Sequence, residues 1–104
     1  MTKVSNRGRK HSRIELVNEV YYESGGQSCL ASWTDLSEGG IHIQTMTPLP
    51  VGTRVKMRIR LEPEGTFYHA VGIVRHSLLA VGMGIEFTGL HPGAKRIIRE
   101  MADR

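Results

Sequence analysis

The chain has 104 residues, of which 39% are apolar and 23% are charged, so it holds one domain and has no room for a second core. No apolar run approaches the ~20 residues that cross a bilayer, and the basic N-terminal segment lacks the apolar stretch of a secretory signal. We therefore expect no membrane insertion. Cys29 is the single cysteine, which excludes an internal disulfide and favours a reducing, cytoplasmic setting.

The excess positive charge of the chain is concentrated at its N-terminus. The formal net charge is +4, from 14 Lys and Arg against 10 Asp and Glu. Residues 1–13 hold 5 of the basic residues and no acid, which leaves 9 basic and 10 acidic groups, a net charge of −1, in the other 91 residues. Such a segment is either a solvated tail or an arm that binds phosphate, nucleic acid or acidic lipid. Composition does not decide between these two interpretations.

The first half of the chain predicts an arm followed by strands. Residues 1–12 contain almost nothing apolar, and we expect them to form a flexible basic arm. The apolar pattern then predicts strands at Arg13–Glu23, at Ser28–Asp35 and around Ile41 and Ile43. Glycine-rich turns at 24–27 and 37–40 separate them, and Gly25-Gly26 suits a hairpin that needs positive φ.

The second half predicts three more strands and a helix. Thr53–Glu62 is the clearest strand, because apolar residues alternate with arginine and lysine throughout. Phe67–His76 and Ala80–Phe87 follow, and Lys95–Ala102 has the apolar spacing of a short helix. Short strands with a turn every 8–12 residues are typical of small barrels. We therefore predict an all-β fold, a six-stranded antiparallel β-barrel with a short C-terminal α-helix, that spans 13–104 as one domain.

Nothing in the sequence favours catalysis or metal binding. Cys29 lies among apolar neighbours in a predicted strand, which is typical of a core residue. The five histidines lack the spacing of a zinc site, and no glycine-rich phosphate loop follows a strand. We expect no enzyme activity, no metal and no cofactor.

Two short motifs offer binding chemistry. Arg9 and Arg13 form an RxxxR motif, and two guanidinium forks on one arm suit phosphates or the Hoogsteen edge of guanine. Asp35, Ser37 and Gly40 form a DxSxxG motif, in which the carboxylate suits the N–H donors of guanine and the glycines allow close approach. Taken alone, RxxxR arises by chance in basic proteins, and DxSxxG also describes an ordinary turn closed by local hydrogen bonds.

Together, in this order and on this strand pattern, the motifs resemble the PilZ domain family. The strands Ala70–Arg75 and Gly82–Phe87 resemble the family's G-x-V-x-R and G-x-x-F strands, so the resemblance covers about 7–101. It implies a six-stranded barrel with a C-terminal helix that binds the bacterial second messenger cyclic di-GMP.

The resemblance also implies roles for individual residues. Arg9 and Arg13 would contact the guanine Hoogsteen edges and the phosphates, while Asp35, Ser37 and Gly40 would hold a guanine on the barrel surface. Four further residues are expected as additional ligand contacts: Arg7, Lys10, Gly39 and Arg75. For Arg7, Lys10 and Arg75, an ordinary exposed position is the alternative.

We therefore expect a cytoplasmic bacterial receptor in which cyclic di-GMP orders the N-terminal arm and changes contact with a partner protein. One alternative is a PilZ-like protein-interaction module that binds no nucleotide. Another is a basic small barrel that binds nucleic acid through the arm and the face formed by Arg54, Lys56, Arg58 and Arg60. We do not expect nucleic acid as the partner, because aromatic residues make up only 6% of the chain.

Overall fold

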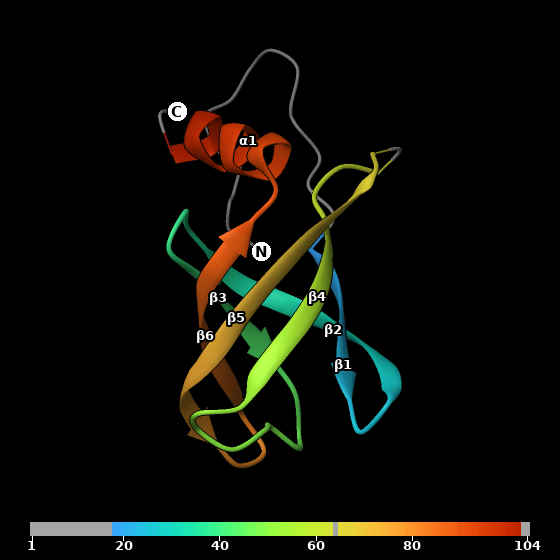
Figure 1. Cartoon of the computed structure of the whole chain (residues 1–104), viewed down its shortest axis with the longest axis vertical. Coiled ribbons are helices and arrows are strands. Elements are labelled where there is room, and N and C mark those ends of the chain that lie inside the picture. The colour runs from blue at the N-terminus through green and yellow to red at the C-terminus, as the bar shows by residue number, and fades with distance from the viewer. Residues whose placement is uncertain (1–17, 64, 103–104) are drawn as a thin grey trace, which may run out of the picture.

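The fold is a closed antiparallel β-barrel with one helix at an end (Figure 1). The structure, a computed structural model, describes residues 18–63 and 65–102. The elements are β1 (Glu19–Ser24), β2 (Gln27–Leu36), β3 (Gly40–Gln44), β4 (Arg54–Arg60), β5 (Phe67–Leu78), β6 (Gly82–Leu90) and α1 (Pro92–Ala102). Around the barrel the strands follow the order β1-β2-β3-β6-β5-β4, so the predicted fold class is confirmed. The arm predicted at 1–12 and the start of the first strand predicted at Arg13 lie outside the described residues.

Alternation of apolar and polar residues builds the core. On β4, Val55, Met57 and Ile59 are buried, while the basic residues between them point outward. The same alternation places residues from every strand inside the barrel, and Ala94 and Ile98 of α1 join the same cluster. The turn predicted between β1 and β2 is confirmed, since Gly25 and Gly26 have φ values of 60° and 84°.

The prediction of a strand from Ala80 was wrong at its start. Strand β5 continues to Leu78, and Ala80 and Val81 belong to the turn before β6. Ala80 has a φ of 65°, and the Val81 N–H donates to the Leu78 carbonyl at 3.0 Å. Ala80 and Val81 therefore form the turn, although their apolar character suggested a strand.

Helix α1 begins at Pro92, three residues before the predicted start at Lys95. Proline is favoured in the first turn of a helix, and the preceding His91 acts as the cap, because its Nδ1 accepts from the Gly93 N–H at 2.9 Å. Near the other end of the helix, Arg99 donates two hydrogen bonds to Glu38, at 2.9 and 3.1 Å. Glu38 lies in the turn between β2 and β3, so this pair ties the turn to α1. In the part of the chain that the structure describes, no helix is long and apolar enough to cross a membrane.

Candidate functional site

Two irregularities in the strands turn polar side chains outward on one face of the barrel. On β2, Thr34 is an extra residue relative to β3, and on β5, Arg75 is an extra residue relative to β6. A bulge of this kind breaks the strict alternation of a strand. Thr34 and Asp35 are consequently both exposed, as are Arg75 and His76. Without the bulges, Asp35 and His76 would point into the core.

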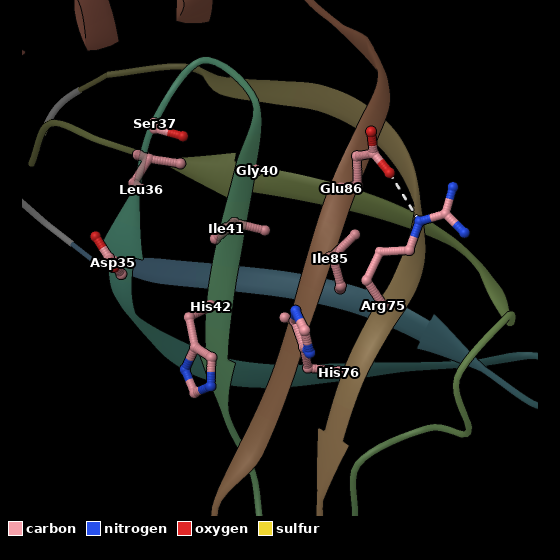
Figure 2. A pocket seen from close by; sticks show the side chains of 11 residues that line it. Asp35, Leu36, Ser37, Gly40, Ile41, His42, Arg75, His76, Ile85 and Glu86 are labelled. Atoms are coloured by element: carbon pink, nitrogen blue, oxygen red, sulfur yellow. Dashed lines mark hydrogen bonds and ion pairs between the residues drawn. The ribbon is translucent and has the colours of Figure 1, made fainter.

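A groove of about 380 Å³ lies on this face, across β2, β3, β6 and β5 (Figure 2). It is lined by Asp35, Leu36, Ser37, Gly40, Ile41, His42, Arg75, His76, Gly84, Ile85 and Glu86. The groove brings together Asp35, Ser37 and Gly40 of the DxSxxG motif with Arg75 from a strand distant in sequence. Gly39, also expected as a contact, lies in the adjoining turn and is not among the lining residues.

Part of the DxSxxG motif closes the turn between β2 and β3. The Ser37 N–H donates to the Gly40 carbonyl at 2.9 Å, and the Ser37 Oγ accepts from the Gly39 N–H at 3.2 Å. The turn interpretation therefore applies to Ser37, whose hydroxyl hydrogen still remains able to donate. It does not apply to Asp35, whose carboxylate has no hydrogen bond within the described ranges. Asp35 is left with its full capacity to accept hydrogen bonds.

Gly40 is required by the close approach of β3 to β6. A Cβ atom built on Gly40 would lie 2.5 Å from the carbonyl oxygen of Ile85, and real Cβ atoms essentially never come that close. Gly40 pairs with Glu86 in the β3–β6 register, and the neighbouring Gly39 carbonyl accepts from the Phe87 N–H at 2.9 Å. The absence of a side chain at Gly40 is therefore needed for β3 to pair with β6, whether or not the groove binds a ligand.

An ion pair holds Arg75 at the β5–β6 side of the groove. Its Nε donates to Glu86 Oε1 at 2.7 Å, as the dashed line in Figure 2 shows. The two side chains are 53% and 56% exposed, so solvent screens the pair and it contributes little to stability. Because only Nε is used, the two terminal amino groups of Arg75 remain able to donate to a ligand.

Two histidines of the groove were not predicted as site residues. His42 on β3 and His76 on β5 both pair with Gly84 on β6, one on each side. The His76 ring lies against Gly84, since a Cβ atom built on that glycine would be 3.3 Å from the His76 Cδ2. The His42 Nδ1 lies 3.3 Å from the Thr34 hydroxyl. The alternation Ile41-His42-Ile43 could have placed His42 outward. The outward position of His76 depends on the bulge at Arg75 and had no signal in the sequence.

The charges of the groove do not by themselves favour an anion. Its lining holds two carboxylates, Asp35 and Glu86, against the one guanidinium of Arg75. The remaining expected contacts, Arg7, Arg9, Lys10 and Arg13, lie outside the described residues. Within those described residues, no group of three or more His, Cys, Asp or Glu side chains could hold a metal ion.

The chain was compared with known families and proteins. The family model of the PilZ domain matches residues 8–104, which include both motifs. No curated protein matches the chain. The match covers more than half of the chain and agrees with the resemblance that the two motifs indicated.

Proposed function

Because the chain belongs to the PilZ domain family, which is generally a family of cyclic di-GMP receptors, we propose that it binds cyclic di-GMP in the groove across β2, β3, β5 and β6. PilZ domains are binding domains and not enzymes. The observation that carries the proposal is the convergence of Asp35, Ser37, Gly40 and Arg75 on one open groove.

The guanine base is the part of the ligand that suits the β2–β3 end of the groove. Asp35 presents a carboxylate that has no hydrogen bond to any described residue and could accept from the adjacent N1–H and N2–H₂ donors of guanine. The oxygen of the Ser37 hydroxyl accepts from the Gly39 N–H, and its hydrogen remains able to donate to the same ligand. Gly40 lines this end of the groove with backbone alone, against which the base can lie.

The phosphates of the ligand require more positive charge than the described groove supplies. Asp35 and Glu86 outnumber Arg75, so a ligand with two negative phosphates needs further cations. In the proposal, Arg9 and Arg13 supply them as bidentate forks, with Arg7 and Lys10 as additional contacts. Arg75 contributes its terminal amino groups from the opposite side of the groove.

The proposed signal is the ordering of the N-terminal arm. An arm of like charges gains a fixed target when the phosphates bind, and its ordering entropy is offset by charge-assisted hydrogen bonds. The altered surface is then recognised by a partner protein. NMR relaxation of residues 5–13 should show fast motion without ligand and rigidity with it. An arm that is equally rigid in both states would contradict this part of the proposal.

Calorimetric titration with cyclic di-GMP tests the proposal. Arg9→Ala and Arg13→Ala should each lose roughly 2–4 kcal/mol of binding free energy, because each removes charge-assisted hydrogen bonds. Arg96→Ala is the matched control, since Arg96 is exposed on α1 away from the groove lining. Wild-type affinity in both motif variants, or no binding by the wild type, would overturn the proposal. Titration with GMP and with single-stranded RNA separates the two alternative functions.

Three contacts between arginines and aromatic rings argue against the nucleic-acid alternative. The Arg58 guanidinium lies 4.9 Å from the ring centre of Tyr21 and 5.8 Å from that of Phe67, and Arg60 lies 5.7 Å from Phe67. These rings are the aromatic groups beside the basic residues of β4. Because arginines of the same protein cover them, they are not open platforms on which bases could stack.

A further inference from the structure

The end of the barrel opposite α1 exposes a cluster of apolar side chains. It consists of Met46 and Val51 from the β3–β4 loop with Leu78, Leu79 and Val81 from the β5–β6 hairpin, which we call the apolar tip. These side chains are between 50% and 77% exposed, and they are five of the seven large apolar residues recorded as exposed in the described ranges. Figure 1 shows both loops at the end of the barrel farthest from the helix.

Backbone hydrogen bonds hold the two loops of the apolar tip together. The Ala80 N–H donates to the Met46 carbonyl at 3.0 Å, and the Thr45 N–H donates to the Val81 carbonyl at 3.3 Å. At the hairpin turn, Ala80 has a positive φ, where Gly or Asn would be the usual residue. The turn thus presents a fixed apolar protrusion instead of the polar residues that hairpin turns normally carry.

The two loops of the apolar tip and the strand β4 that follows one of them carry no negative charge. Residues 43–61 and 65–85, which include both loops, all of β4 and β5, and the adjoining ends of β3 and β6, contain no Asp or Glu. Arg54 and Lys56 follow the β3–β4 loop on the outer face of β4, about 7 Å apart along the strand. Both are exposed, and neither forms an ion pair with a carboxylate of the described chain.

The size and charge of this surface select its partner. A stable protein interface uses about 20–30 residues a side, far more than the five of the apolar tip. A second copy of the chain would bring Arg54 and Lys56 of both copies together, which like charges oppose. A bilayer needs only a few apolar side chains at the level of the acyl boundary, with cations at the headgroups.

We propose that the apolar tip docks on the surface of a bilayer that contains anionic lipids. Leu78 and Leu79 enter the boundary between headgroups and acyl chains, while Arg54 and Lys56 contact lipid phosphates. The hairpin stays folded, so the chain lies on the membrane and does not cross it. This inference is independent of nucleotide binding, because the docking residues do not line the groove.

Flotation of the full chain with vesicles tests the inference. Vesicles of phosphatidylglycerol and phosphatidylcholine should bind the wild type, and Leu79→Ser should lower the partition coefficient by about tenfold or more. The paired change Arg54→Gln with Lys56→Gln should lower it by about fivefold for each charge removed. Leu30→Ser is the matched control, since Leu30 is 56% exposed but lies on β2 outside the apolar tip. Residues 1–13 are unchanged in every variant, so their charge cannot account for a difference in the partition coefficient between variants.

A second measurement locates the contact with the bilayer. Trp33 is the single tryptophan and is 7% exposed, so its emission should be insensitive to vesicles. A Leu79→Trp variant should therefore show a blue shift on anionic vesicles that comes from residue 79. Absence of this shift, or equal flotation of the wild type and Leu79→Ser, would overturn the inference. A concentration-dependent dimer in sedimentation velocity that Leu79→Ser abolishes would also overturn it, in favour of a second copy as the partner.

Discussion

The close approach of β3 to β6 gives a sharp prediction for Gly40→Ala. The added Cβ would lie 2.5 Å from the Ile85 carbonyl oxygen, and ordinary contact begins at 3.4 Å. The two strands must therefore separate by about 0.9 Å, because backbone atoms of a packed barrel cannot turn aside as a flexible side chain can. Such a separation weakens the hydrogen bonds that join β3 to β6 beside Gly40, each worth about 1 kcal/mol net.

We expect Gly40→Ala to lower the free energy of unfolding by about 2–4 kcal/mol and the melting temperature by about 10 °C or more. Gly39→Ala is the matched control in the same turn, because its added Cβ would lie 3.9 Å from the Ser37 Oγ, which is ordinary contact. Both changes remove the same glycine freedom from the unfolded chain, which is worth roughly 0.4–1 kcal/mol in favour of folding. The difference between the two variants therefore isolates the clash.

Urea unfolding followed by the fluorescence of Trp33 measures this difference, since that residue is buried in the folded barrel. Circular dichroism at low temperature establishes that each variant folds before its stability is compared. Equal unfolding midpoints for Gly39→Ala and Gly40→Ala would refute the reasoning. The result would mean that β3 and β6 can separate at no cost, and that the motif glycine has no structural role.

Three further predictions concern single side chains. Asp35→Ala should weaken cyclic di-GMP binding. The wild type should reject cyclic di-AMP, because adenine lacks the paired N–H donors from which this carboxylate accepts hydrogen bonds. Equal competition by the two nucleotides in calorimetry would contradict that role. Hydrogen bonds from Arg99 lower the pKa of Glu38 from 4.5, so its contribution to stability is present above that pH and is lost as the pH falls through the lowered value. Glu38→Gln should therefore melt slightly below the wild type at pH 7, and the difference in melting temperature should shrink as the pH falls below 4.5. A difference that widens in acid would contradict this sign. His91→Ala should lower the free energy of unfolding by about 1 kcal/mol, because the cap of α1 is lost. His91→Asn keeps a hydrogen-bond acceptor at this position and should keep most of that free energy. Equal losses in both variants would argue against capping.

The sequence by itself determined the class of fold, because the signals that specify it are local. The alternation of Val55, Met57 and Ile59 with basic residues assigns one face of β4 to the core without knowledge of any neighbouring strand. Gly25 and Gly26 likewise mark the first hairpin, since they suit the positive φ that its turn requires. The spacing of the DxSxxG motif also correctly indicated that its residues share one turn and its adjoining strands.

Only the tertiary structure decided which side chains face the groove, because the register between strands depends on residues far apart in the chain. Strict alternation from the buried Trp33 would send Asp35 into the core, and the extra residue at Thr34 turns it outward. The same effect at Arg75 brings His76 to the groove, although no local pattern marks it. The requirement for Gly40 likewise comes from the Ile85 carbonyl, 45 residues later in the chain, which approaches only once the barrel has closed.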